Sequence, residues 1–557
     1  MGKRFFYSHL TSIFALLVLA YFFLMLGNGS VSLTHPDEVF YIDSAKEMLA
    51  HNSWFTPMIF DHIQFEKPFL AFAMFMTAIK AFGLNPAAAR FFPALFAIIG
   101  VMSVYGIAII LFRNRRVAFL SGLVLATSFI YMALARAVLT DMIFTTWVSL
   151  STGAFCLAYY SREKRAGATL AAFVFMAAAV LTKGLLGICF PLTTLILFLI
   201  YQRDLKFLWQ GSMVWGFLLM LALAVPWHVM MYQRYGDFFL YEYFGNVHIR
   251  RLYAAEHPKL NTPFFYPGLM FAGIMPWSLF WFPAAQNVWQ RFQEKSGDRD
   301  KIFFLLAWML AILAFIQPAA SKLASYVFPL FPAVAIFIAY YLDRALSLSV
   351  STGNNRGLAG CGYAMSLILW GIAGGGILAG LKYPAVIKEM TPVYITAGAA
   401  VVVALLIFTA ARQGNFIRMI FFFPALSGVL LLALFLGRPY AEPWVSCQDV
   451  SRALLKEDTS GNPVIASKFY VRGVWYYTGL PTAVMDINGE GFWSPHPIPF
   501  LNDDKKVLEF LLQQKVTFAV VKESNSQDLK RILANQPFRS RELYGKAGKY
   551  ILRIEKQ

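Results

Sequence analysis

Eight ionisable residues in the polar stretches between apolar segments have side chains that could bind an anion or carry a proton. They are Asp37, Glu66, Lys67, Asp141, Lys183, His248, Arg251 and Lys322. Lysine and arginine can bind a phosphate that departs in a transfer reaction, while a carboxylate can orient a sugar or accept a proton. Acids and bases gathered at one membrane surface would therefore suit a lipid-linked substrate that bears a phosphate.

The acidic residues also have an ordinary structural interpretation. Asp37 and Glu38 follow Pro36, a pattern typical of a first helical turn, where carboxylates interact favourably with the helix dipole. Asp141 would serve as a helix N-cap, with Thr140 as the competing cap. Position in the sequence leaves both interpretations open for each carboxylate.

The basic residues have alternatives of the same kind. Lys183 and Lys322 would extend from apolar turns toward water. Lys67 would form a surface pair with its neighbour Glu66 or, because an apolar interfacial segment follows it, would contact a lipid phosphate. A lone histidine is more often not a metal ligand, so the loop position of His248 leaves its role open.

The composition excludes a soluble or a disordered protein. Of the 557 residues, 58% are hydrophobic and 14% are charged, against about 25% charged residues in an ordinary soluble domain. The net charge of +18 is distributed over short loops, which is typical of membrane proteins and argues against a nucleic-acid partner. No GxxxxGK[ST] motif occurs, so no nucleotide is expected as a cofactor. The four cysteines include no CxxC pair, which argues against a disulfide framework or a cysteine zinc site.

Apolar segments long enough to cross a membrane recur along most of the chain. They cover 10–27, 88–112, 117–135, 141–160, 166–181, 185–201, 209–230, 264–285, 301–318, 323–342, 357–381, 392–411 and 415–437. No small-residue cleavage site follows the first segment, so we expect an uncleaved helix there rather than a signal peptide.

The basic residues predict the topology. If 68–83 lies in the interface and the N-terminus is cytoplasmic, six basic loops are also cytoplasmic. These loops are 113–116, 162–165, 203–206, 291–301, 343–356 and 412–418. Counting 68–83 as a span would move all six outside, against the positive-inside rule. We therefore predict thirteen spans and place residues 438–557 outside the cytoplasm.

The predicted fold is an α-helical polytopic membrane protein with a small C-terminal α/β domain. The transmembrane core covers 1–437 and includes a first outer loop with juxtamembrane helices (28–87) and a second outer loop (231–263). Residues 438–557 mix strand-like and helix-like patterns. The strand-like runs are 464–470, 516–521 and 550–554, and the helix-like runs are 503–514 and 528–534.

Eight motifs between about residues 30 and 335 carry a family resemblance. They are HPDEVFYIDSAKEMLAHNSW (35–54), FEKP (65–68), AVLTD (137–141), LTKG (181–184), AVPW (224–227), HIRR (248–251), GIMPW (273–277) and SKLASYVFPLFP (321–332). The chain resembles the lipid A 4-amino-4-deoxy-L-arabinose transferases, bacterial relatives of the protein O-mannosyltransferases in the GT-C glycosyltransferase superfamily. The resemblance implies a core of about thirteen helices with an outer C-terminal domain, a polyprenyl-phosphate sugar donor, and inversion at the anomeric carbon.

The resemblance also implies roles for individual residues. Asp37, with Glu38 beside it, matches an acidic residue near the reacting sugar, and Asp141 matches a second functional aspartate. Lys67 matches a lysine that contacts the carrier phosphate. Glu66 with His248 resembles a pair of ligands for a divalent metal, Zn²⁺ or Mg²⁺. The other candidates for binding the donor or its carrier phosphate are Arg251, Lys183, Lys322, Tyr326 and Tyr41.

Three positions depart from the pattern of these transferases. Phe40 stands before Tyr41, where they usually have an arginine. Asp141 is displaced relative to their VLDPF stretch, and Val247 rather than an acid precedes the histidine. Because the missing arginine removes one anion contact, the acceptor, the donor sugar, or both can differ from the aminoarabinose case.

The pattern favours a glycosyltransferase of the bacterial inner membrane. It would move 4-amino-4-deoxy-L-arabinose, or a related sugar, from undecaprenyl phosphate to lipid A at the periplasmic face. A transferase acting on protein Ser/Thr or on another glycan would use the same kind of site. The rival from another class is a transporter or flippase of a lipid-linked sugar, although we find no internal repeat of the kind seen in many transporters. A purely structural subunit would not need eight ionisable residues in outer turns. The sugar, the acceptor and the oligomeric state stay open.

Overall fold

The computed structural model describes residues 8–294, 297–352, 355–384, 389–458, 460–494 and 496–557. The basic segment 1–4 lies outside them. The chain divides into two compact units. The helical unit comprises residues 1–28 and 90–436, and the sheet unit comprises residues 29–89 and 437–557. The segment 29–89, predicted as an outer loop of the core, therefore groups by its contacts with the C-terminal segment.

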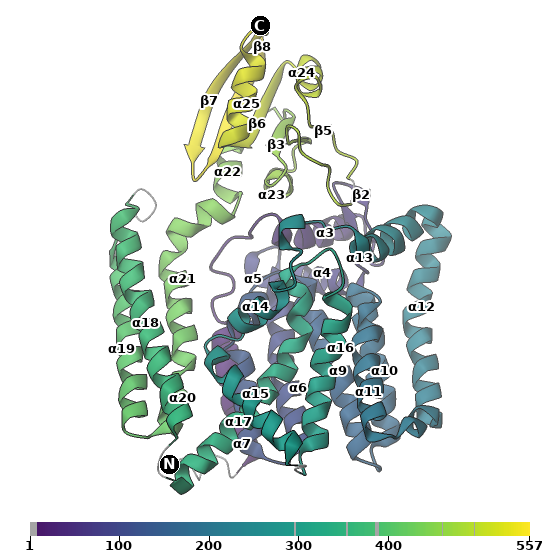
Figure 1. Ribbon diagram of the computed structural model, residues 1–557. Coiled ribbons are helices and arrows are strands. Elements are labelled where there is room, and N and C mark those ends of the chain that lie inside the picture. Colours follow the sequence, from purple (N-terminus) through teal and green to yellow (C-terminus); the bar gives the residue numbers. More distant parts are fainter. Residues whose placement is uncertain (1–7, 295–296, 353–354, 385–388, 459, 495) are drawn as a thin grey trace. The chain divides into compact units, whose positions relative to one another are not determined.

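The helical unit consists of helices that run along one another (Figure 1). Its main helices are α2 (His9–Ala20), α6 (Phe91–Phe112), α7 (Arg115–Ala126), α8 (Phe129–Ala135), α9 (Thr140–Tyr160), α10 (Arg165–Lys183), α11 (Leu186–Gln202), α12 (Gly211–Phe239), α13 (Arg250–Tyr253), α14 (Phe265–Gly273), α15 (Trp281–Gln293), α16 (Arg299–Ile316), α17 (Phe331–Thr352), α18 (Arg356–Lys382), α19 (Thr391–Arg412), α20 (Phe416–Phe422) and α21 (Pro424–Val445), which continues into the sheet unit. Shorter helical turns join them: η1 (Tyr21–Met25), η2 (Leu205–Trp209), η3 (Leu240–Ile249), η4 (Pro258–Leu260), η5 (Trp277–Phe280) and η6 (Ala324–Leu330).

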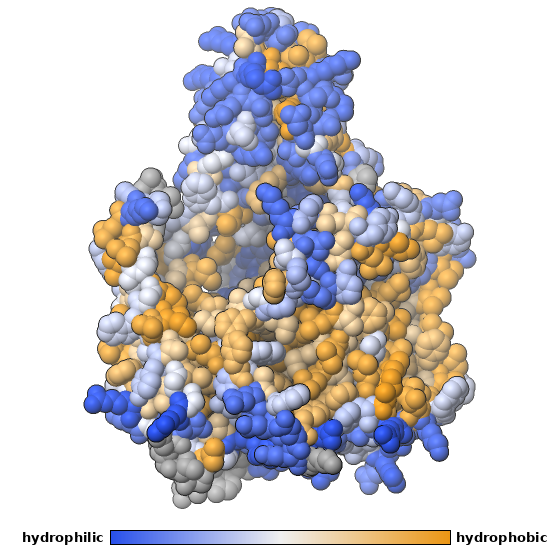
Figure 2. Space-filling model, in the orientation of Figure 1, coloured by the Kyte–Doolittle hydropathy of each residue, from blue (hydrophilic) through white to orange (hydrophobic). Residues whose placement is uncertain are grey.

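These helices make the chain a multi-pass membrane protein. Eight helices of the described residues are long and apolar enough to cross a bilayer, or ten if each of two bent pairs forms one span. Large apolar side chains such as Trp215, Leu367 and Leu434 are exposed, and hydrophobic residues cover much of the helical unit (Figure 2). Such a surface is stable against lipid and not against water. The count of thirteen spans stays a prediction.

Two of the predicted spans are bent rather than straight. The pair α7 and α8 bends by 64°, and the pair formed by α14 with the segment Trp277–Gln293 bends by 111°. At the first bend, the hydroxyls of Thr127 and Ser128 donate to backbone carbonyls one turn earlier, which competes with the helix's own hydrogen bonds. At the second bend stands Pro276, which has no backbone N–H to continue a helix.

Five of the predicted cytoplasmic loops lie at one end of the helical unit. Tyr160, at the end of α9, donates to Asp300 at the start of α16 (2.9 Å), and Tyr340 of α17 donates to Asp298 (3.1 Å). The Arg299 guanidinium lies 5.7 Å from the ring of Tyr201, near the end of α11. These contacts tie together the helix ends that the basic loops connect, as the charge pattern predicts.

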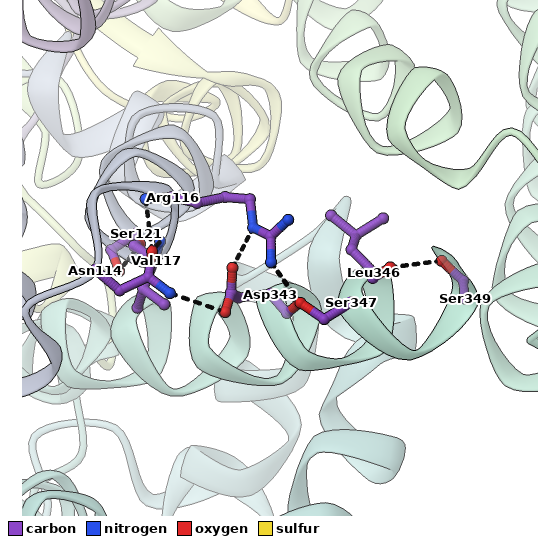
Figure 3. Close-up of polar contacts among 8 residues, drawn as sticks. All are labelled: Asn114, Arg116, Val117, Ser121, Asp343, Leu346, Ser347 and Ser349. Carbon is purple, nitrogen blue, oxygen red and sulfur yellow. Dashed lines mark hydrogen bonds and ion pairs between the residues drawn. The ribbon is translucent and has the colours of Figure 1, made fainter. Parts of the chain in front are cut away.

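A polar cluster joins α7 to α17 at the same end (Figure 3). Asn114 caps α7 by accepting from the Arg116 backbone N–H (2.9 Å), and its amide donates to the Asp343 carboxylate (3.0 Å). The Arg116 guanidinium forms an ion pair with Asp343 and also donates to the Ser347 hydroxyl. Because the side chain of Asp343 is only 11% exposed, its charge requires this partner.

The sheet unit combines the segment after the first helix with the C-terminal segment. The former contains α3 (Asp37–Ala50), β1 (Met58–Ile59), β2 (His62–Ile63), α4 (Leu70–Phe82) and α5 (Pro86–Ala89). At 1.5 Å per residue, α4 is only about 20 Å long, less than the hydrocarbon core of a bilayer. This length agrees with the prediction that 68–83 does not span the membrane.

The C-terminal segment forms the predicted small α/β domain. Its elements are α22 (Gln448–Glu457), β3 (Val464–Ser467), α23 (Val471–Thr478), β4 (Thr482–Met485), β5 (Phe500–Leu501), α24 (Asp504–Leu512), β6 (Val516–Lys522), α25 (Glu523–Leu533), β7 (Phe538–Lys546) and β8 (Lys549–Lys556). The sheet order is β5-β4-β3-β6-β8-β7. Strands β5, β4, β3 and β6 are parallel to one another, and β8 is antiparallel to both of its neighbours, β6 and β7. The strand predicted over 464–470 is shorter, because Tyr470 already caps α23.

Hydrogen bonds and ring contacts join the two segments of the sheet unit. The Trp475 indole donates to Glu47 of α3 (3.1 Å), and the Tyr477 hydroxyl donates to the Leu33 carbonyl (3.2 Å). The buried His35 ring lies edge-on to Tyr470, at 5.2 Å. The first residue of the HPDE motif therefore packs against the C-terminal segment.

We expect the ion pair in Figure 3 to contribute to folding stability. Replacing Asp343 with Ala leaves Arg116 without its anion and should lower the free energy of unfolding by about 1–2 kcal/mol, since Arg116 is partly exposed. The double variant Arg116→Ala/Asp343→Ala should lose less than the sum of the single variants. Denaturant unfolding in detergent measures both quantities. Removing the exposed pair Lys505–Glu509 is the control, and additive losses at Arg116 and Asp343 would contradict the prediction.

Candidate active site

Asp141 and Lys183 form a buried ion pair at the end of the helical unit opposite the basic loops. Asp141 lies in the first turn of α9, and Lys183 is the last residue of α10. Their side chains are 6% and 9% exposed and are in ion-pair contact. The N-cap of α9 is Leu139, without a side-chain cap, so the capping prediction for Asp141 and Thr140 was wrong. Lys183 likewise does not extend toward water.

Tyr326 places Lys183 next to a second cation. The Lys183 ammonium lies 5.0 Å from the centre of the Tyr326 ring, a cation–π distance. The Tyr326 hydroxyl accepts a hydrogen bond from Arg251, and Arg251 also pairs with Glu256 at 3.1 Å. Two carboxylates, one phenol and two cations thus form a continuous array.

Backbone pairing between distant segments brings Arg251 to this position. The Ser321 N–H donates to the Arg251 carbonyl (3.1 Å), and the Ala320 N–H donates to the Leu252 carbonyl (3.0 Å). The helix predicted to end at 230 extends further, to a kink at Gly236, whose φ is +52°. Helical turns resume after the kink and continue as η3, so much of the predicted second outer loop is helical. The segment after the kink carries the HIRR motif to the SKLASY motif.

His248 lies against Gly184 in the same unit. Its Nδ1 is 2.5 Å from the Tyr243 carbonyl oxygen, which assigns the ring proton to Nδ1 and leaves Nε2 as an acceptor. A Cβ at Gly184 would lie 2.4 Å from His248 Nε2, and the φ of Gly184 is +111°. Glycine is therefore required here both by space and by backbone conformation.

Lys322 is buried and bound to backbone. Its ammonium donates to the carbonyls of Gln317 (2.7 Å) and Ala319 (3.0 Å), just after α16, and lies 5.4 Å from the Tyr266 ring centre. A lysine in this position compensates the carbonyls at a helix C-terminus. It does not extend toward water as the alternative interpretation predicted.

The sheet unit holds the other candidates, beginning with the two acids of the HPDE motif. Asp37 is the first residue of α3 and is exposed, whereas Glu38 is buried. The Glu38 carboxylate accepts hydrogen bonds from the backbone N–H (2.9 Å) and the hydroxyl (2.8 Å) of Thr34. Glu38 therefore stabilises the start of the helix, while the Asp37 carboxylate is accessible.

The FEKP motif is fixed to α3 through a glutamine. The Glu66 N–H donates to the Gln64 side-chain oxygen (2.9 Å), and the Gln64 amide donates to the Ser44 hydroxyl (3.2 Å). The Lys67 ammonium donates to the Glu66 carbonyl (2.9 Å), and Lys67 is 8% exposed. Tyr41 is buried, with its ring 6.0 Å from that of Phe72.

The candidates thus form two groups. Asp141, Lys183, His248, Arg251, Lys322 and Tyr326 belong to the helical unit, and Asp37, Glu38, Tyr41, Glu66 and Lys67 belong to the sheet unit. Among the described residues, no three or more His, Cys, Asp or Glu side chains cluster as metal ligands. Because Glu66 and His248 belong to different units, their metal pairing stays a prediction.

Two buried acids of α3 were not predicted from the sequence. Asp43 is 1% exposed, and burial raises its pKa to about 7 despite the nearby Lys46. Burial also raises the pKa of Glu47, although the hydrogen bonds that its carboxylate accepts act to lower that pKa. They lie on the face of α3 that carries the contact with α23.

Comparisons with known proteins point to one group of enzymes. Residues 10–242 match the Dolichyl-phosphate-mannose-protein mannosyltransferase family. The undecaprenyl phosphate-alpha-4-amino-4-deoxy-L-arabinose arabinosyl transferase of Erwinia tasmaniensis is 28% identical over 316 residues, which cover 56% of this chain and 55% of that protein. An uncharacterized protein of Aquifex aeolicus is 30% identical over 327 residues, covering 58% of this chain and 62% of that protein. The chain spans little more than half the length of these relatives.

The structural similarity covers nearly the whole chain. The crystal structure of ArnT from Cupriavidus metallidurans bound to undecaprenyl phosphate superposes with a TM-score of 0.77 at 20% identity, covering 98% of both chains. This chain has the ArnT fold. The helical core and the C-terminal α/β domain predicted from the sequence are therefore confirmed.

Within the ArnT fold of this chain, Gly184→Ala should impair the site. The new Cβ would displace His248 from its position against the LTKG turn, so we expect transfer activity to fall by about tenfold or more. The control is Gly167→Ala in α10, the helix that Gly184 caps, where no atom lies within 4 Å of the added Cβ. Thermal unfolding and donor-dependent transfer are measured for both variants. Equal activity of the two variants would contradict the role of Gly184.

The buried Asp43 predicts a pH-dependent stability. Because its pKa is raised in the folded state, that state binds more protons than the unfolded state between about pH 4 and pH 7. The free energy of unfolding should therefore fall as the pH rises through this range. Asp43→Asn removes the buried charge and should be more stable than the wild type at pH 8, by about 2–4 kcal/mol, with the difference vanishing near pH 4. Thermal unfolding scans of both proteins between pH 4 and pH 8 measure how this stability difference changes with pH. A difference that does not depend on pH would contradict the prediction.

Proposed function

We propose that this chain is a glycosyltransferase that moves a sugar from undecaprenyl phosphate to lipid A. The sugar is 4-amino-4-deoxy-L-arabinose or a close relative, and the configuration at its anomeric carbon inverts. The observation that carries the proposal is the array of Asp141, Lys183, Tyr326 and Arg251 at one end of an apolar helical unit with the ArnT fold. The names of the sequence relatives support the choice of donor and sugar.

The array is suited to a phosphate that gains charge. When the bond between the anomeric carbon and the carrier phosphate breaks, negative charge develops on the phosphate. Fixed cations there stabilise the transition state by about 2–4 kcal/mol for each good contact. Arg251 and Lys183 are held by Tyr326 and Asp141, so little reorganisation is needed as the charge develops. In this mechanism Lys67 also binds the carrier phosphate.

The acceptor decides whether a base is needed. A lipid A phosphate is already ionised and attacks the anomeric carbon without losing a proton. A serine or sugar hydroxyl must lose a proton during attack, and the exposed carboxylate of Asp37 would accept it. With lipid A as the acceptor, Asp37 orients the sugar.

A divalent metal belongs to the proposal as an auxiliary group. Glu66 and His248 would supply two ligands, and substrate phosphate oxygens would supply others. Two protein ligands completed by phosphate suit Mg²⁺ better than Zn²⁺, which usually has three protein ligands in catalytic sites. Such a metal would add positive charge near the carrier phosphate.

The inner membrane is the proposed location, with the site and the C-terminal domain on the periplasmic side. The basic loops share the end of the helical unit opposite the array. If these loops are cytoplasmic, as the positive-inside rule favours, the array faces the periplasm. That is the side on which a lipid-linked sugar and lipid A would meet.

Mass spectrometry of lipid A tests the proposal. Cells that carry the gene should add one sugar mass to lipid A, and cells without the gene should not. Asp37→Ala should abolish the addition, while it should alter stability little because the side chain is exposed. Glu457→Ala, which removes another exposed carboxylate of the sheet unit, is the matched control and should keep the added mass.

The result also distinguishes the acceptors. An aminopentose-sized mass that requires both the gene and Asp37 supports the lipid A assignment and identifies the sugar class. Unchanged lipid A in cells that express the folded protein would refute that assignment. In that case, a pH profile of transfer that reports the ionisation of Asp37 would indicate a hydroxyl acceptor.

A further inference from the structure

Arg472, in the first turn of α23, reaches the FEKP motif from more than 400 residues along the chain. Its guanidinium lies 3.9 Å from the Glu66 carboxylate and 3.2 Å from Nε2 of His496. The side chains of Arg472 and Glu66 are 14% and 17% exposed. All three residues belong to the sheet unit, so the contact lies within one compact part of the chain.

Aromatic rings fix the direction of the guanidinium. Its centre lies 4.5 Å from the ring centre of Phe40 and 5.3 Å from that of Phe492. Contacts of this kind attract a delocalised cation and restrict its rotation. Phe40 belongs to α3, so the guanidinium lies against this helix as well as near the FEKP motif.

His496 completes the cluster as a neutral acceptor. Burial and, to a smaller extent, the adjacent Arg472 lower its pKa to about 4. A neutral imidazole can accept the hydrogen bond from the guanidinium at Nε2. The His496 ring also packs on Phe60, at 5.2 Å between ring centres, and on Phe492, at 5.0 Å.

The contact with Glu66 bears on the neighbouring lysine. The Lys67 ammonium donates to the Glu66 carbonyl (2.9 Å), so the position of Lys67 depends on the conformation of residue 66. The Glu66 N–H donates to Gln64, and the Glu66 carboxylate is attracted by the Arg472 guanidinium at 3.9 Å. Both interactions favour one orientation of the residue whose carbonyl accepts the hydrogen bond from Lys67.

We propose that Arg472 is a positioning residue of the FEKP motif, through which the C-terminal domain orients Glu66 and Lys67 for the donor phosphate. This inference rests on the proposed function and deepens it, because it assigns the C-terminal domain a part in donor binding. Arginine suits the role because one planar group contacts a carboxylate, an imidazole and two aromatic faces. Lysine would keep the charge but not the fork of donors.

Binding of undecaprenyl phosphate in detergent micelles tests the proposal on the full-length protein. The variants are Arg472→Ala, Arg472→Lys, Glu66→Gln and the double variant Arg472→Ala/Glu66→Gln. Arg472→Ala should raise the Kd about tenfold, and Arg472→Lys should raise it less. If Arg472 acts through Glu66, the double variant should match Glu66→Gln to within about twofold. The control is Arg531→Ala, which removes an exposed arginine paired with Asp504 in the same domain.

Each outcome has a definite meaning. Independent, multiplicative losses in the double variant would mean that Arg472 acts only on general stability and would overturn the proposal. Unchanged binding by Arg472→Ala would overturn it as well. Arg472→Lys is the variant that keeps the charge and much of the packing. A larger Kd of this variant at an unchanged unfolding temperature supports positioning even if Arg472→Ala folds poorly. Absence of binding by the wild-type protein would instead refute the proposed donor.

Discussion

The ion pair between Asp141 and Lys183 is the interaction on which the rest of the site depends. Each charge is nearly removed from water, and an isolated charge in such a place would be strongly unfavourable. The pairing therefore sets the ends of α9 and α10 side by side. It also directs the Lys183 ammonium toward the Tyr326 ring, and Tyr326 in turn receives Arg251. The order of these contacts explains why residues from four separate segments form one array.

The surrounding lipid explains why the chemistry lies at the helix ends. Backbone groups within the hydrocarbon must be satisfied inside a helix, and charges there are costly. The ionisable groups of the helical unit accordingly gather at its two ends. One end carries basic loops tied by tyrosine–aspartate bonds and by the Arg116–Asp343 pair, whereas the other carries the array.

The sheet unit is stabilised in a different way. Its catalytic candidates lie on helix α3 and in the segment of the FEKP motif, and these two segments could not form a hydrophobic core by themselves. The C-terminal α/β domain supplies that core, and α23 contacts α3 through Trp475 and Glu47. A small folded domain therefore serves as the support for motifs that precede it by several hundred residues. This arrangement gives a physical reason for the presence of the α/β domain in the chain.

Sequence patterns alone predicted the helical membrane class, the small C-terminal α/β domain, the shortness of the apolar segment that forms α4 and the common end of five basic loops. These features follow from local composition, periodicity and charge, which the chain carries without reference to its partners in space. Residue types also marked Asp141, Lys183, Arg251 and Lys67 as candidates. Only the tertiary structure decided that Lys183 pairs with Asp141, that Lys322 binds the carbonyls after α16, that Glu38 supports a helix start, and that Arg472 contacts Glu66. The contacts of Lys183 and Arg472 join residues far apart in the chain, and burial, which exists only once the chain has folded, selects their partners. Those of Lys322 and Glu38 are local, but whether the side chain turns to the backbone or to water depends on the packing around it.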